Sequence, residues 1–140
     1  SNNSIRDKGV IELSQSAMLK NLQVLELEEN YIGEEGMTSL GENTSWVRLQ
    51  WLNLKGCYFG AAGAEKLSKN TAWKNIEEMN LAWNKTLDRG AEMLCQNSSW
   101  RKLKSLNLEN NSISSRLEEK LKSNSNWPKL SNLSVNSANS

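Results

Sequence analysis

The chain has 140 residues, of which 37% are hydrophobic and 24% are charged, a balance that is typical of a single globular domain. Its 17 Lys and Arg residues and 16 Asp and Glu residues leave a net charge of +1, whereas a protein that binds a phosphate backbone needs an excess of positive charge. No run of about 18 apolar residues is present. We therefore expect neither a nucleic-acid partner nor a membrane partner.

A tryptophan recurs every 27 residues, at Trp46, Trp73, Trp100 and Trp127, and the segments between these residues are similar to one another. A fixed period of this size indicates units that bury their apolar side only by stacking on their neighbours. We expect one repeat domain, either complete or part of a longer array. It would cover residues 1–140 as a half unit (1–18), four units (19–45, 46–72, 73–99 and 100–126) and a partial unit (127–140).

Each unit carries the pattern L-x-x-L-x-L near its start, with Ile76 and Met79 in place of the first two leucines in the unit 73–99, and this pattern ends in an alternation of apolar and polar residues. Alternation with a period of two predicts a short strand with one buried face. In the second full unit, Leu52 and Leu54 would face the core. Trp51, Asn53 and Lys55 would face the other side of the sheet.

A turn is expected after each strand. One turn position carries a short polar side chain in every full unit: Asn30, Cys57, Asn84 and Asn111. A side-chain amide at this position can bond the backbone groups that a bend leaves unpaired. Stacked units would line these amides into a ladder.

A helix is expected after each turn. A glycine followed four residues later by a leucine, as at Gly36 and Leu40, predicts a short helix that runs antiparallel to the strand. We expect Asp88 to cap the N-terminus of the helix in unit 73–99. Ser115 and Glu118 have the spacing of a capping box for the helix that follows.

This pattern resembles the leucine-rich repeat family, and within it the ribonuclease-inhibitor-like class. The segment 22–40 matches L-x-x-L-x-L-x-x-N-x-I-G-x-x-G-x-x-x-L almost completely. The sequence departs from the pattern where tryptophan replaces the leucine usual at the start of a unit, and where Cys57 replaces asparagine. The resemblance implies an α/β fold, a right-handed β-α solenoid that forms a segment of the leucine-rich repeat horseshoe. It also implies a parallel sheet on the concave face, helices on the convex face, and partners held in the concavity.

Two groups of tryptophans are distinguished by their phase. The four periodic tryptophans hold the same position in every unit, which favours a buried aromatic spine over a row of exposed rings for ligand stacking. Trp51 falls on the face expected to be concave, and Trp83 falls where the next strand ends. Because Trp is enriched among interface hot spots, these two residues either anchor a partner or are incidental surface aromatics.

Charged and amide side chains surround these two tryptophans. The glutamates form an acidic patch that favours a basic or polar partner, although a merely solvated sheet face would show the same pattern. Asn53 and Asn80 share one phase, and their amides would bond within the protein or to a ligand; we favour bonding within the protein. The expected partner-binding residues are Trp51, Trp83, Glu26, Glu28, Glu78, Asn53, Asn80 and Lys55.

Catalysis finds little support. The chain has no histidine, which removes His-based catalysis and His metal ligands. Cys57 and Cys95 fall at different positions in the repeat, so we expect two free thiols and not a zinc site, a redox pair or a disulfide. We therefore expect no enzyme, no cofactor and no bound metal. Free thiols indicate a reducing compartment, so we expect a cytoplasmic protein, or one delivered into a host cell if it resembles the repeat proteins of intracellular bacteria.

The leading functional hypothesis is a protein-protein interaction module that binds a macromolecule through the concave face. The alternative is a structural spacer or regulatory segment of a larger protein, as in innate immune receptors that contain arrays of this class. A family of GTPase-activating proteins shares the fold, but we cannot place the residues that carry its activity on this sequence, so that role is implied by resemblance alone.

Overall fold

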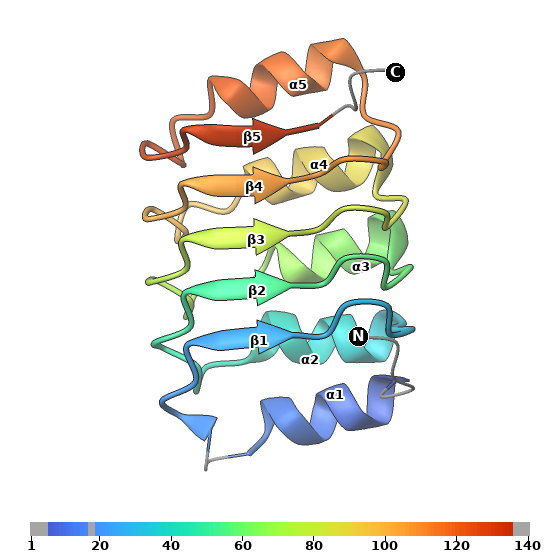
Figure 1. Ribbon diagram of the computed structural model, residues 1–140, viewed down its shortest axis with the longest axis vertical. Coiled ribbons are helices and arrows are strands. Elements are labelled where there is room, and N and C mark those ends of the chain that lie inside the picture. The colour runs from blue at the N-terminus through green and yellow to red at the C-terminus, as the bar shows by residue number, and fades with distance from the viewer. Residues whose placement is uncertain (1–5, 17–18, 136–140) are drawn as a thin grey trace.

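The computed structural model describes residues 6–16 and 19–135, in which five helices and five short strands alternate (Figure 1). Residues 1–5, 17–18 and 136–140, which include the outer ends of the expected half unit and partial unit, lie outside the described residues. The elements are α1 (Arg6–Ser14), β1 (Val24–Glu26), α2 (Glu34–Glu42), β2 (Trp51–Asn53), α3 (Gly60–Leu67), β3 (Glu78–Asn80), α4 (Leu87–Cys95), β4 (Ser105–Asn107), α5 (Ser115–Lys122) and β5 (Asn132–Ser134).

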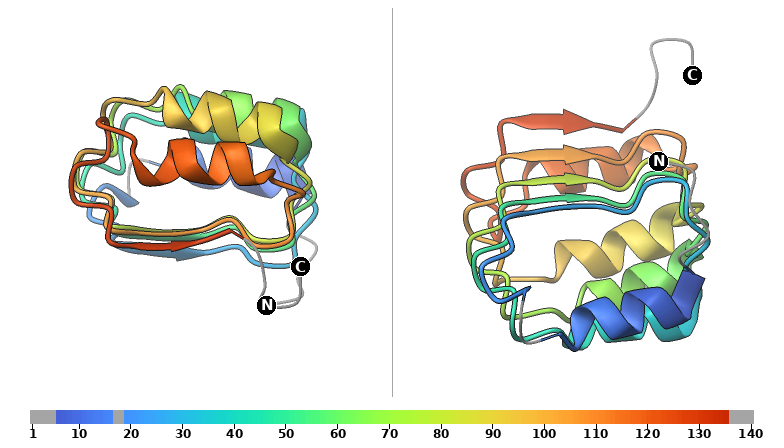
Figure 2. Two further views of the ribbon diagram at one scale, coloured as in Figure 1. Left: turned by 90° about the horizontal axis from the view of Figure 1, so that it is seen from above. Right: turned by 60° about the horizontal axis from the view of Figure 1, so that its bottom comes forward.

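The strands form one parallel sheet in the order of the sequence, and the helices cover one of its faces (Figure 2). Each residue of β1 to β4 pairs with the residue 27 positions further along the chain, so that Leu25 pairs with Leu52 and Leu52 pairs with Met79. These central strand residues are buried between the sheet and the helices. The other face of the sheet is open. This arrangement confirms the predicted β-α solenoid.

The periodic tryptophans are confirmed as core residues, because none of the four side chains is more than 2% exposed. Trp46 and Trp73 are stacked with ring centroids 6.3 Å apart, and Trp100 and Trp127 are stacked at 6.4 Å. The indole Nε1 of Trp73 also donates a hydrogen bond to Oδ1 of Asn43, at 3.1 Å. The tryptophans therefore link two pairs of neighbouring units through ring contacts, and Trp73 adds a polar contact to the preceding unit.

The predicted asparagine ladder after the strands is confirmed. Asn84 donates from Nδ2 to the carbonyl oxygen of Leu54 in the preceding unit, at 2.8 Å, and its Oδ1 accepts from the backbone N–H of Cys57, at 2.7 Å. Asn111 repeats both contacts one unit later. Cys57 stands in the ladder in place of asparagine, and its thiol donates to the carbonyl oxygen of Leu27 at 3.0 Å. The thiol thus keeps the donor role of the missing amide.

A second ladder precedes the strands, on asparagines that the sequence analysis did not single out. Its members are spaced 27 residues apart and each lies shortly before a spine tryptophan: Asn43, Asn70, Asn97 and Asn124. Asn70 donates to the carbonyl oxygen of Asn43 at 3.0 Å and accepts from the backbone N–H of Trp73 at 3.0 Å. The recurrence of these asparagines every 27 residues was the signal in the sequence that could have revealed this ladder.

The predicted N-cap of the helix in unit 73–99 is wrong. Helix α4 begins at Leu87 after Thr86, so Asp88 lies in the first turn and does not cap it. The Asp88 carboxylate instead accepts from the backbone N–H of Ser114 at 2.8 Å and from its hydroxyl at 2.7 Å. These two hydrogen bonds lower the pKa of Asp88. The side chain therefore ties the start of α4 to the start of the next helix.

The predicted capping box of the last helix is also displaced by one residue. Ser114, and not Ser115, is the N-cap of α5, and its hydroxyl accepts from the backbone N–H of Leu117 at 3.3 Å. Glu118 consequently lies one position too late to return a bond to the cap. It forms an ion pair with Lys122 within the helix, at 3.4 Å.

The two cysteines are confirmed as free thiols, and both are buried. Cys57 lies in the turn after β2, and Cys95 is the last residue of α4. Burial raises the pKa of each thiol to about 11. Because only the thiolate is a strong nucleophile, neither side chain is poised for reaction near neutral pH.

Replacing a spine tryptophan should destabilise the protein far more than replacing Trp83, which is 55% exposed. Trp73→Ala should lower the free energy of unfolding by about 3 to 5 kcal/mol, because it leaves a cavity beside Trp46 and removes the hydrogen bond from Nε1 to Oδ1 of Asn43. Trp83→Ala should cost about 0.5 kcal/mol or less. Urea unfolding curves of both variants test this, and similar midpoint shifts would show that the two positions are equally buried.

Both thiols should be silent in the native protein and reactive after unfolding. At pH 8 each native thiol remains protonated, since its pKa is about 11, while the unfolded chain exposes ordinary thiols. Titration with a disulfide reagent under non-reducing conditions should therefore show no fast-reacting group in buffer and two in denaturant. Fast reaction of the native protein would contradict the burial of Cys57 and Cys95.

Candidate functional site: the open sheet face and the strand-exit rim

The parallel register lines up one column of outward side chains across the open face. Trp51 is paired with Val24 on one side and with Glu78 on the other. Val24 is 49% exposed and Glu78 is exposed, whereas Trp51 is half-buried. The indole thus lies on the open sheet face between an apolar and an acidic neighbour, as its position in the strand predicted.

A second column contains Glu26, Asn53 and Asn80 in adjacent strands. The Oδ1 atom of Asn53 accepts from the backbone N–H of Lys55 at 3.0 Å, and Oδ1 of Asn80 accepts from that of Ala82 at 3.1 Å. Each of these amide oxygens is therefore engaged within its own unit, which agrees with the interpretation favoured from the sequence. Glu26 is exposed at the end of the same column.

The chain leaves each strand through a turn with the same left-handed residue. Glu29, Gly56, Trp83 and Asn110 occupy equivalent positions and have φ angles of 60°, 66°, 60° and 60°. A residue with a side chain adopts this conformation only where its surroundings impose it. The backbone N–H of Trp83 bonds to the carbonyl oxygen of Glu109 in the next unit, at 2.9 Å, which holds the turn in place.

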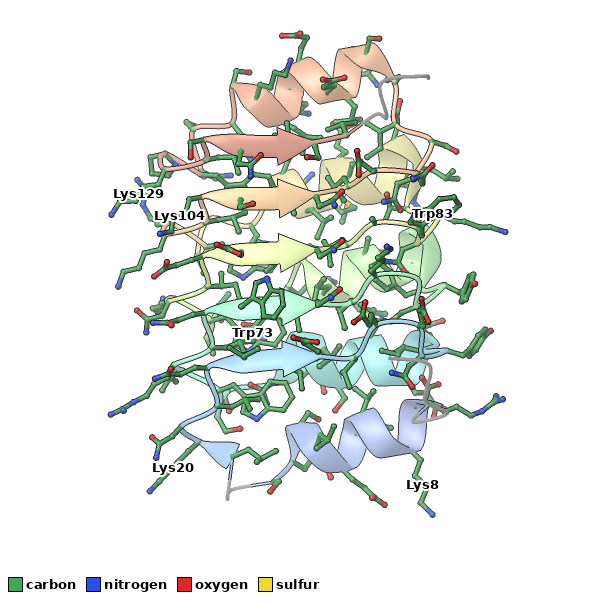
Figure 3. The ribbon with its side chains drawn as sticks, viewed as in Figure 1. Lys8, Lys20, Trp73, Trp83, Lys104 and Lys129 are labelled. Atoms are coloured by element: carbon green, nitrogen blue, oxygen red, sulfur yellow. The ribbon has the colours of Figure 1, made fainter. Side chains whose placement is uncertain are left out.

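These turns enclose a shallow cavity of about 510 Å³ at the exit edge of the sheet. It is lined by Glu29, Lys55, Gly56, Tyr58 and Trp83. Two aromatic rings, one cation and one carboxylate thus converge on one space. Figure 3 shows Trp83 at this edge, on the side to which the strands point.

Exposed apolar side chains gather at the same edge. Among the described residues, six large hydrophobic side chains are exposed, and four of them lie in the turns after the strands or at the helix start that follows: Tyr31, Tyr58, Trp83 and Leu87, the first residue of α4. We call these four residues, together with Glu29 and Lys55, the exit rim. The tyrosines were missed from the sequence, although the chain has only two and they are 27 residues apart.

The expected binding residues therefore separate into two adjoining groups. The open face holds Trp51, Glu26, Glu78, Asn53 and Asn80, as the strand register places them. The exit rim holds the remaining two that reach the cavity, Lys55 and Trp83. Glu28 lies between the groups, half-buried, and its carbonyl oxygen accepts from Asn30 at 3.3 Å.

Neither a metal-binding cluster nor a membrane-spanning helix is found in the described part of the chain. No group of three or more His, Cys, Asp or Glu side chains in residues 6–16 and 19–135 is arranged to hold a metal ion. None of the helices within those residues is long and apolar enough to cross a bilayer. The site presents aromatic and acidic side chains, whereas Asn53 is buried and Asn80 is half-buried.

Comparisons with known proteins agree with the repeated architecture. Residues 19–41 and residues 102–124 each match a family model described as leucine-rich repeat. Among solved structures, the chain is similar to actin-binding site 2 of leiomodin-1, with a TM-score of 0.68 and 14% sequence identity over 92% of this chain and 78% of that chain. No curated protein matches the chain. Since the repeat pattern, the parallel sheet and the helices behind it coincide with these matches, the chain has the fold of a leucine-rich repeat solenoid.

Proposed function

We propose that this protein is a protein-interaction module that holds its partner against the open face and the exit rim. Leucine-rich repeats generally mediate protein-protein interaction, which agrees with this role. The observation that carries the proposal is the gathering of exposed aromatic side chains at one edge. Trp83 and Tyr58 are 55% and 61% exposed beside a cavity, where a soluble protein gains nothing by keeping them.

The size of the sheet explains why the rim must take part. Five parallel strands spaced about 4.8 Å apart span only about 20 Å, and the strands are short. Such a face offers a few hundred Å², below the roughly 800 Å² that each partner contributes to a standard interface. The exit turns widen the surface and add its most exposed apolar groups.

Charge favours a basic partner for this surface. The open face and the exit turns carry Glu26, Glu28, Glu29, Glu78 and Glu109 against Lys55 and Lys85. An acidic surface attracts a basic partner and repels an acidic one, which influences association rate and selectivity more than affinity.

Within the leucine-rich repeats, we propose the ribonuclease-inhibitor-like class, since each unit from α2 to α5 carries a helix of eight or nine residues. We also propose a reducing compartment, consistent with two free thiols.

The rim double variant Tyr58→Ala/Trp83→Ala should lose partner binding by roughly tenfold or more, because it removes two exposed aromatic anchors. Trp51→Ala tests the open face separately. Val47→Ala is the matched control, because Val47 is also exposed, at 47%, but lies where the chain enters the sheet. The measurement is quantitative recovery of captured proteins from a lysate of the source cells, followed by the affinity of each purified candidate and by urea unfolding of each bait.

Two outcomes would decide against the proposal. If the rim variant, Trp51→Ala and wild type capture the same proteins with the same affinity, the spacer or regulatory role becomes the better account. If the rim variant also unfolds at much lower urea, its loss of binding is a loss of fold. Actin co-sedimentation is a control for specificity. We expect no particular affinity for actin, because likeness to leiomodin-1 at 14% identity reflects the shared fold alone.

A further inference from the structure

The turns that lead into the strands form a second charged surface, at the opposite edge of the sheet. These entry turns are residues 20–23, 47–50, 74–77, 101–104 and 128–131. Together they contain a single acidic residue, Glu77, and seven cations that are all exposed and that we call the entry strip: Lys20, Arg48, Lys74, Arg101, Lys102, Lys104 and Lys129. Figure 3 shows Lys20, Lys104 and Lys129 along this edge, with Trp83 across the sheet.

Side-chain contacts hold neighbouring entry turns side by side. Asn75 donates to the carbonyl oxygen of Val47 at 2.8 Å, and its own Oδ1 accepts from Nζ of Lys102 at 2.7 Å. Nζ of Lys104 lies 2.9 Å from the carboxylate of Glu77. The turns therefore follow one another at the spacing of the strands, about 4.8 Å, so the strip is a continuous row.

The contact between Glu77 and Lys104 shows what kind of group the strip accommodates. This carboxylate lies across two adjacent turns and raises the pKa of Lys104. By contrast, Lys74, Arg101 and Lys129 form no ion pair with any residue in the described part of the chain. Three exposed cations in consecutive turns thus have no carboxylate partner, and they lie beside the Glu77–Lys104 ion pair.

We propose that the entry strip binds a short acidic segment of a partner protein, lying along the row of turns. Five of the seven cations belong to the last three turns, which span about 10 Å plus the reach of the side chains. An extended peptide advances about 3.3 Å per residue, so a segment of about four to six residues matches this length. Its carboxylates would repeat, on the unpaired cations, the contact that Glu77 makes with Lys104.

The same observations disfavour other anionic partners. A membrane surface or a DNA duplex extends well beyond a patch of this size and would meet the glutamates of the open face. The entry turns themselves contain no aromatic side chain on which single-stranded bases could stack. The tryptophans that precede them are buried, and Trp51, which follows one of them, is half-buried on the open face. The net charge of +1 does not argue against an acidic partner, because it averages the entry strip with the acidic opposite edge.

Fluorescence anisotropy with a fluorescein-labelled hexaglutamate peptide tests the proposal. The triple variant Lys74→Glu/Arg101→Glu/Lys129→Glu removes only cations without an ion pair in the described residues. The matched control Lys8→Glu/Lys69→Glu/Lys85→Glu makes the same change in net charge at exposed positions outside the entry turns. At low salt, wild type should bind the peptide, the strip variant should bind it roughly tenfold or more weakly, and the control should change by less than about threefold.

A salt titration and two other anionic ligands complete the experiment. Binding should weaken as salt rises to about 0.15 M, because exposed charges are screened. Absence of hexaglutamate binding by wild type at low salt would overturn the proposal, as would equal weakening in the strip and control variants. Phosphatidylserine vesicles and oligothymidylate are titrated in parallel. If either binds more tightly than the peptide and loses binding in the strip variant, the partner is a lipid surface or a nucleic acid and the proposal is wrong.

Discussion

Each turn of this solenoid leaves backbone N–H and C=O groups that no strand or helix pairs, and buried asparagines of neighbouring units bond these groups. A buried polar group without a partner costs about 1 to 3 kcal/mol, so the turns could not pack together otherwise. One ladder runs through Asn84 and Asn111 after the strands, and another through Asn43 and Asn70 before them. The spine tryptophans and leucines supply apolar contact, and the ladders pair the backbone groups of the turns where one unit follows the next.

The exit rim and the entry strip are consequences of this constraint. Because every unit repeats its turns in the same place, a side chain that departs from the pattern, such as Trp83, is presented at a fixed position among its neighbours. Side chains that recur, such as Tyr31 and Tyr58, become rows. The two ends of the strands therefore carry opposite character, aromatic and acidic where the chain leaves the sheet and basic where it enters. A nearly neutral protein can thus present two charged surfaces.

The sequence allowed the strands, the order of units, the tryptophan spine and one ladder to be predicted, because each follows from a residue that recurs with one period. It did not allow the helix starts to be located to the residue. Asp88 bonds to the next unit, and this contact between units has no local signature. The cavity at the exit rim was not predicted either, since the left-handed turn that exposes Trp83 is stabilised by a bond to Glu109 in another unit. The entry strip was hidden by a net charge that cancels over the whole chain.

Comparison of two asparagines in one unit tests most directly whether the ladders hold the array together. The Asn84 side chain makes two hydrogen bonds to the preceding unit, whereas the Oδ1 atom of Asn80 accepts from a backbone N–H of its own unit. In urea unfolding, Asn84→Ala should lower the free energy of unfolding by about 2 to 4 kcal/mol, and Asn80→Ala by about 1 kcal/mol or less. Equal losses for the two variants would contradict the account, because the contacts between units would then contribute no more than a local turn.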